Sequence, residues 1–78
     1  GEEEPIKIIE LSIDGTTYQA EEGMTWYEWL YSSYNVDDYS YDGDYVTDLW
    51  ETYIICNSDG SPVMVGDRII AGAAYTMG

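Results

Sequence analysis

Apolar and polar residues alternate in the first quarter of the chain, which is the pattern of a short β-hairpin. Residues 9–13 read IELSI, so one side of this segment is apolar and the other is polar. Asp14-Gly15 follows, and this pair favours the type I′ turn, in which both central residues need a positive φ. Residues 16–21 then form the predicted return strand.

A helix is predicted directly after this hairpin, over residues 25–33. Thr25 is a favourable N-cap residue, and Glu28 three positions later completes a capping box, in which two side chains and two backbone amides bond reciprocally. The helical face that we expect to lie on the sheet contains Trp26, Trp29, Leu30 and Ser33.

The second half of the chain is predicted to contain loops and short strands. Residues 35–48, NVDDYSYDGDYVTD, show little periodicity and are predicted to be a loop, with a short strand near residues 45–49. Residues 57–62 are a cluster of turn-forming residues. Further strands are predicted at residues 53–56, at Val63 and Val65, and at residues 68–77 with a bend at Gly72.

Together these elements predict one α+β domain, with the order ββα followed by two or three strands and a mixed sheet packed on one helix. We expect the domain to span residues 6–78, and residues 1–5 to form a flexible acidic N-terminus. A chain of 78 residues buries only about 60% of its unfolded surface on folding, so we expect a small margin of stability.

Three segments carry a resemblance to a known family: the hairpin around Asp14-Gly15, the helix entry at residues 22–26 with Trp29-Leu30, and residues 65–69, VGDRI. They resemble the β-grasp (ubiquitin-like) family, and in particular the small sulfur-carrier proteins of thiamin and molybdopterin synthesis. Sulfur carriers end in Gly-Gly, whose carboxylate is activated, whereas this sequence ends in YTMG. The resemblance therefore implies a β-grasp fold and not the sulfur-carrier activity.

A second, shorter resemblance involves residues 23–26, GMTW, and residues 32–35, SSYN. These residues resemble small modules of unassigned role in proteins of gut bacteria and their phages. The resemblance implies a domain appended to a larger protein, and it implies no activity.

The sequence is strongly acidic, which narrows the range of partners. Asp and Glu number 16 and face only Lys7 and Arg68, giving a net charge of −14. Nucleic acids are bound through clustered Lys and Arg, so we expect no nucleic-acid partner. No apolar run approaches the ~20 residues that span a bilayer, so we expect no membrane insertion. The charge favours cations, basic proteins or neutral ligands such as glycans.

The residue types that most enzymes use are scarce in this chain. Histidine is absent and Cys56 is the single cysteine, which excludes His-based triads, Cys–His dyads and sulfur-rich metal sites. Carboxylates in a solvated segment lack the burial that would separate their pKa values for acid–base chemistry. We therefore expect a protein that is not an enzyme and needs no cofactor, with calcium as the one candidate ion.

The calcium candidate lies in the acidic segment. Residues 38–44, DYSYDGD, resemble the first half of a calcium-binding loop, with oxygen ligands at alternate positions and a glycine at the bend. Leu49 occupies the position at which an EF-hand needs a bidentate glutamate, so a solvated acidic loop is the alternative interpretation. The candidate ligands are Asp38, Asp42, Asp44 and Asp48.

Tyrosines form a candidate partner-binding surface beside the predicted core. Rings interleaved with small polar residues make adaptable contacts at low entropic cost. The alternative is that the rings cover the edge of the core, as a small domain requires. Three of them follow one line of the predicted helix and three lie in the acidic segment: Tyr27, Tyr31 and Tyr34, and Tyr39, Tyr41 and Tyr45.

The sequence thus predicts a non-catalytic interaction module that binds a protein, and we expect a basic one, through an acidic tyrosine-rich surface. A calcium-stabilised or glycan-binding module is one alternative. An acidic mimic of nucleic acid that blocks a basic protein is another.

Overall fold

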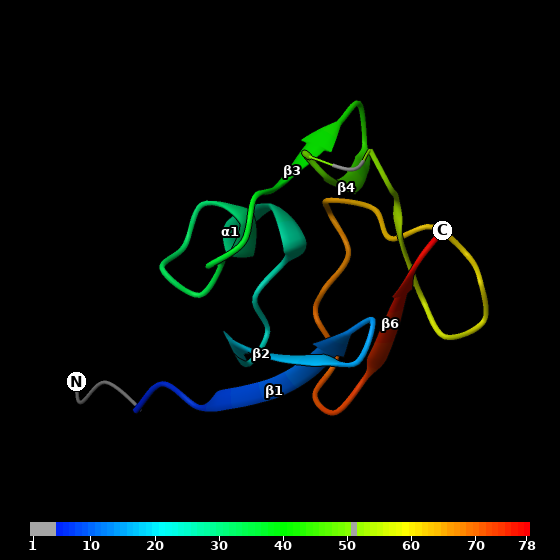
Figure 1. The fold of residues 1–78 in the computed structure, drawn as a ribbon. Coiled ribbons are helices and arrows are strands. Elements are labelled where there is room, and N and C mark those ends of the chain that lie inside the picture. The colour runs from blue at the N-terminus through cyan, green and yellow to red at the C-terminus, as the bar shows by residue number, and fades with distance from the viewer. Residues whose placement is uncertain (1–4, 51) are drawn as a thin grey trace.

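The computed structural model describes residues 5–50 and 52–78, and these contain six short strands and one short helix (Figure 1). Residues 1–4 of the expected flexible N-terminus lie outside the described residues. The elements in chain order are β1 (Ile8–Ile13), β2 (Thr16–Glu21), α1 (Trp26–Leu30), β3 (Tyr39–Asp42), β4 (Tyr45–Asp48), β5 (Ile55–Cys56) and β6 (Ala74–Met77).

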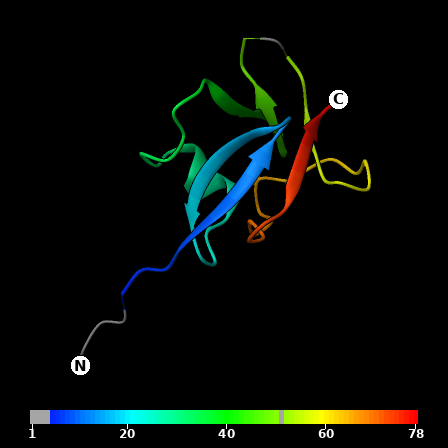
Figure 2. The same ribbon diagram turned by 60° about the horizontal axis from the view of Figure 1, so that its bottom comes forward.

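Four strands form one mixed sheet in the order β2-β1-β6-β5. β1 pairs antiparallel with β2 and parallel with β6, whereas β5 and β6 are antiparallel. The two central strands are therefore the first and the last of the chain, as Figure 1 and Figure 2 show. The prediction of a small α+β domain with a mixed sheet is confirmed.

The turn between β1 and β2 has the geometry that its sequence favours. Asp14 and Gly15 have φ values of 52° and 88°, as a type I′ turn requires. The register pairs Leu11 with Tyr18 and Ile9 with Ala20. Because directly paired residues share a face of the sheet, these side chains form one buried apolar surface.

Helix α1 begins with the predicted capping box. The Thr25 hydroxyl accepts a hydrogen bond from the Glu28 amide (3.3 Å), and the Glu28 carboxylate accepts one from the Thr25 amide (3.1 Å). The hydrogen bonds from Thr25 hold the pKa of Glu28 below its ordinary value. The cap therefore fixes both the start of the helix and a negative charge at its N-terminus.

The helix ends at Leu30, three residues earlier than the predicted end at residue 33. Ser32 provides the physical reason. Its hydroxyl donates to the Trp29 carbonyl (2.7 Å) and accepts from the Tyr34 amide (3.2 Å). Such local side-chain bonds offer the backbone an alternative to helical hydrogen bonds, so the chain leaves the helix here.

The core lies on the face of the sheet that α1 covers, and it extends beyond the helix. Trp26 and Trp29 pack edge-to-face with ring centroids 5.3 Å apart, and both are fully buried. Val46 of β4 and Val63 of the chain after β5 are also fully buried in the same cluster. A sheet packed on one helix is thus too simple a description, because a five-residue helix covers only part of the sheet.

Most of the predicted loop over residues 35–48 is a β-hairpin, and its second strand, β4, confirms the short strand predicted near residues 45–49. β3 and β4 pair antiparallel, with Tyr41 opposite Val46, and Gly43 in the turn has a positive φ of 64°. Val46 is fully buried while Tyr45 is exposed, but Thr47 on the other side of Val46 is buried too, so burial does not follow a simple alternation along β4. Four-residue strands carry too few alternations for the period to be visible in the sequence.

The last part of the chain contains less strand than predicted. Residues 68–71 are not in a strand, and β6 begins only at Ala74. Ile69 is bound instead to the start of the helix, since its amide donates to the Met24 carbonyl (2.9 Å), and its side chain is buried. Gly72 follows with a φ of 74°, so the predicted bend is present before β6. The expected strand at Val63 and Val65 consists of isolated bridges that involve Pro62 and Met64.

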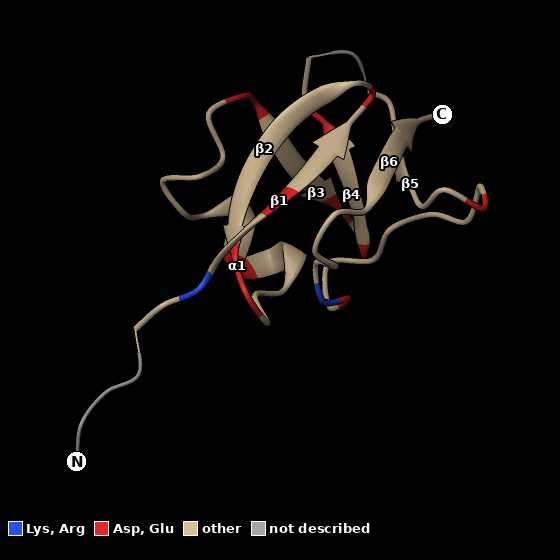
Figure 3. Ribbon diagram, turned by 90° about the horizontal axis from the view of Figure 1, so that it is seen from below, with Lys and Arg blue, Asp and Glu red and all other residues tan. Residues whose placement is uncertain are grey.

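Acidic residues are spread over strands, turns and loops (Figure 3). Because a net charge of −14 repels itself, we expect the melting temperature to rise when ionic strength rises from about 10 mM to about 150 mM and the Debye length falls from ~30 to ~8 Å. Circular dichroism melts in potassium chloride measure this. Repeating them in sodium chloride controls for specific cation binding, and a flat or falling melting temperature contradicts the prediction.

Candidate functional site

Three of the six candidate tyrosines meet on the surface. Tyr27 lies on α1, and Tyr31 is the C-cap residue of the same helix, about one helical turn later. Tyr41 lies on β3. Their ring centroids are 5.0 Å (Tyr27–Tyr31), 6.0 Å (Tyr27–Tyr41) and 6.4 Å (Tyr31–Tyr41) apart. The side chains remain 51%, 66% and 42% exposed in that order. We call this group the tyrosine triad.

Backbone hydrogen bonds hold the two elements of the triad together. The Tyr27 amide donates to the Val65 carbonyl (2.8 Å), and the Val65 amide donates to the Asp44 carbonyl (2.9 Å). Asp44 belongs to the turn between β3 and β4, so residue 65 ties this hairpin to the first turn of α1. The arrangement of the triad therefore follows from the fold and not from the side chains alone.

Tyr31 of the triad has a raised pKa, so its phenol group keeps its proton at neutral pH. A side-chain hydrogen bond with Tyr41, together with burial, raises the pKa of Tyr31. Neutral phenol groups keep an electron-rich ring face and a hydroxyl that both donates and accepts hydrogen bonds. The triad can therefore bind a partner through its ring faces and through hydrogen bonds of its hydroxyl groups.

Two other candidate tyrosines belong to the edge of the core. Tyr39 packs on Trp29 with ring centroids 5.9 Å apart, and Tyr34 lies against the same core cluster. The Tyr34 hydroxyl donates to the Glu21 carboxylate (3.1 Å). The structure thus separates the six candidates, because these two rings cover the core while the triad rings lie on one another.

Tyr45, the sixth candidate, lies apart from the triad. Val46, the next residue on β4, faces the core and is paired with Tyr41, so these two side chains share one face of the hairpin. Tyr45 therefore points to the opposite side of the hairpin, where it is 41% exposed and bridges to Met64.

Sequence reasoning did not identify a polar cluster beside the core. Tyr18 is buried, its ring packs edge-to-face on Trp29, and its hydroxyl donates to the Asp37 carboxylate. The Tyr39 hydroxyl lies 3.4 Å away. Burial, and then the bond to Asp37, raise the pKa of Tyr18 strongly. The available signal was a tyrosine on the apolar face of a predicted strand, which needs a partner for its hydroxyl.

The four candidate calcium ligands lie in two separate pairs. Asp38 and Asp48 are at one end of the β3–β4 hairpin, and Asp42 and Asp44 are at its turn. Three strand positions span ~10 Å, whereas calcium holds its ligands at about 2.3–2.6 Å. Among residues 5–50 and 52–78, no group of three or more His, Cys, Asp or Glu side chains is placed to hold a metal ion.

Trp50 engages the first of these pairs. Its indole Nε1 donates to the Asp38 carboxylate, and its backbone amide donates to the Asp48 carboxylate (3.0 Å). The Trp50 side chain is nevertheless 76% exposed. No role was predicted for Trp50 from the sequence. The signal available was the apolar pair Leu49-Trp50 at the end of the acidic segment, because such a pair is unusual in a solvated loop.

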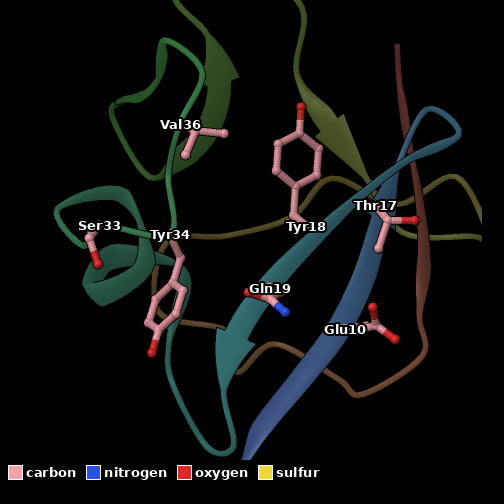
Figure 4. Close-up of a pocket in the computed structure, with 7 residues that line it drawn as sticks. All are labelled: Glu10, Thr17, Tyr18, Gln19, Ser33, Tyr34 and Val36. Atoms are coloured by element: carbon pink, nitrogen blue, oxygen red, sulfur yellow. The ribbon is translucent and has the colours of Figure 1, made fainter.

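A shallow groove of about 360 Å³ follows the edge strand β2 (Figure 4). Glu10 is the one acidic or basic residue of the Asp, Glu, Lys and Arg types in this lining, and the rest is polar or aromatic apart from Val36. Such a lining lacks the paired ionisable groups that acid–base catalysis uses. The lining residues are Glu10, Thr17, Tyr18, Gln19, Ser33, Tyr34 and Val36.

Comparison of the chain with protein-family models, with curated proteins and with solved structures found no match. The structural class is therefore assigned from the elements themselves: a small α+β domain with a mixed sheet and one short helix. Within the described part of the chain, no helix has the length and apolar character needed to cross a bilayer.

Proposed function

We propose that this protein is a non-catalytic interaction module that binds a basic protein surface through the tyrosine triad. The observation that carries this proposal is the packing of three half-exposed tyrosines on one another, outside the core. Tyrosine is enriched at the centres of protein interfaces, since it buries a large area and loses little conformational entropy.

A purely structural role explains the triad poorly. A ring that completes the core packs against core side chains, as Tyr34 and Tyr39 do. The triad rings pack on each other and are 42–66% exposed, and they come from two elements that backbone hydrogen bonds already join. An exposed aromatic patch of this kind is typical of an interaction site.

The charge of the molecule favours a basic partner. At a net charge of −14, a positively charged surface is attracted over the whole approach, and its association rate is raised at low salt. Asp44 and Glu28 place carboxylates on the two elements that carry the triad. The electrostatic attraction would therefore persist up to the contact itself.

We also propose that the fold is of the β-grasp type. The ββα start, the mixed sheet and the helix on one face of that sheet support this assignment. A fold of this type hosts many unrelated functions, so the assignment carries no activity with it.

Alanine at all three triad positions, Tyr27, Tyr31 and Tyr41, is expected to abolish partner binding while the protein stays folded. Exposed side chains cost little to remove, about 0.5 kcal/mol each, whereas hot-spot rings carry most of the binding energy. The wild-type and variant proteins, immobilised side by side, are offered basic proteins from a lysate. Titration calorimetry then measures each captured protein, with at least ~10-fold weaker binding expected for the variant.

Tyr53→Ala is the matched control, because Tyr53 is 46% exposed and lies outside the triad. This variant should bind like the wild type. Equal capture by the triad variant would contradict the proposed function. Loss of the native circular dichroism spectrum in the triad variant would also contradict it, because the rings would then belong to the fold.

A further inference from the structure

We infer that the tyrosine triad receives an arginine side chain of the partner, held above the three rings. This inference rests on the proposed function, and it adds the chemical group that the site recognises. It follows from the shape of the triad, from the positions of the two basic residues of this chain and from the negative charge of the molecule.

The shape of the triad suits a cation. The three centroids form a triangle with sides of 5.0, 6.0 and 6.4 Å. A cation about 4 Å above the middle of that triangle lies within ~6 Å of all three centroids, the range in which a ring face attracts positive charge. The rings are tilted by 50–67° to one another and not stacked in parallel, and the three residues are 42–66% exposed, so much of their surface is open to solvent.

Neither basic residue of this chain occupies that position. Lys7 and Arg68 are the only two in the sequence. The Lys7 ammonium pairs with the Glu22 carboxylate at 3.4 Å, and the Arg68 guanidinium donates to the Gly23 carbonyl at 2.6 Å. Neither Lys7 nor Arg68 therefore supplies a cation over the triad.

The surroundings favour a guanidinium over an ammonium group. A guanidinium can lie flat on a ring and still donate hydrogen bonds in its own plane, whereas an ammonium is compact and strongly hydrated. Glu28, which follows Tyr27 in α1, and Asp44, whose backbone carbonyl accepts from the Val65 amide, add negative charge to the segments that carry the triad. A planar cation that lies flat on exposed rings thus matches arginine.

The test uses two small probes that differ in charge and hardly in shape. N-acetyl-arginine-N-methylamide is titrated into the isotope-labelled full chain at constant ionic strength, and its citrulline counterpart is titrated in parallel. Ring and amide resonances are followed by NMR. We expect saturable shifts centred on Tyr27, Tyr31 and Tyr41 with arginine, binding at least ~5-fold weaker with citrulline, and intermediate binding with the lysine derivative.

Two variants separate ring faces from hydroxyl groups. Tyr41→Phe keeps the ring and should retain at least about half of the arginine affinity, whereas Tyr41→Leu keeps a similar apolar bulk and should lose most of it. The dispersion of the Trp26 and Trp29 resonances, which are buried away from the triad, shows whether each variant is folded.

Equal binding of arginine and citrulline, or no saturable shift at the triad, would overturn the inference. Such a result would leave the proposed function intact if the triple alanine variant still lost its protein partners, since contact would then be apolar or through hydroxyl groups. Conversely, arginine could bind at the triad while the triple alanine variant still captures its protein partners. That pair of results would contradict the proposed function, and the triad would then be a cation-binding site only.

Discussion

Replacing Trp29 with alanine is expected to lower the free energy of unfolding by about 3–5 kcal/mol. Trp29 is fully buried, and its ring packs on Trp26, Tyr18 and Tyr39. Its indole Nε1 also donates to the Gln19 carbonyl at 2.9 Å, a bond that alanine cannot make. A domain of 78 residues has roughly 4–12 kcal/mol of stability in total, so much of the variant should be unfolded at 37 °C.

Urea denaturation followed by circular dichroism measures this loss. Trp29→Phe keeps an aromatic ring but removes the indole hydrogen bond and part of the ring volume, so it should cost about 1–3 kcal/mol. Trp50→Ala is the matched control: that side chain is 76% exposed, and its removal should change stability by no more than ~0.5 kcal/mol. Similar losses at positions 29 and 50 would contradict the assignment of Trp29 to the core.

Raising the pH above about 10 is expected to destabilise the protein through Tyr18. This side chain is 7% exposed, and burial together with its bond to Asp37 raises the pKa of Tyr18. A tyrosine in the unfolded chain ionises near pH 10. The stabilisation is therefore complete below pH ~10 and is lost above it, because the unfolded state releases its proton first. The loss should approach ~1.4 kcal/mol per pH unit, or about 3 kcal/mol by pH 12.

Urea unfolding at pH 8, 10, 11 and 12 tests this expectation. In the Tyr18→Phe variant, the slope of the free energy of unfolding against pH should fall by the amount that one ionising group contributes. The stability of this variant at pH 8 should also be lower, because the hydrogen bonds of the hydroxyl group are lost. Tyr34 and Tyr39 also have raised pKa values, so the variant should retain a weaker slope. Tyr53→Phe changes an exposed ring and should behave like the wild type. An unchanged slope in Tyr18→Phe would contradict the prediction.

The parts of the fold that depend on neighbouring residues could be predicted from the sequence. The Asp14-Gly15 turn and the capping box of Thr25 and Glu28 are decided by local dihedral preferences and local hydrogen bonds, and both are present. The end of α1 was wrong by three residues because Ser32 competes locally for the backbone, an effect that helical periodicity does not contain.

Strand β3 and the burial of Ile69 could not be predicted in this way. β3 is four residues long, and Ile69 is buried from an irregular segment that is bound to Met24. Both depend on what the rest of the chain leaves uncovered, and no short window of sequence carries that information.

The candidate site was predictable only as a set of residues. The line of Tyr27, Tyr31 and Tyr34 assumed a helix that continues to residue 33, and because α1 ends at Leu30, Tyr34 turns toward the core. Tyr41 joins Tyr27 and Tyr31 because of the β3–β4 hairpin, which the sequence did not indicate. Spacing therefore identified ring-bearing segments, while tertiary contacts decided which rings meet.

During synthesis, β1 leaves the ribosome long before its second partner exists. Ser12 and Ile13 pair with Ala74 and Tyr75, almost at the other end of the chain. Until those residues emerge, the nascent β1–β2 hairpin exposes an apolar face and one unpaired strand edge to other chains. Pairing of β1 with β6 must therefore follow release of residues 74–77, and a pause in translation before residue 74 would leave this domain open to aggregation and proteolysis.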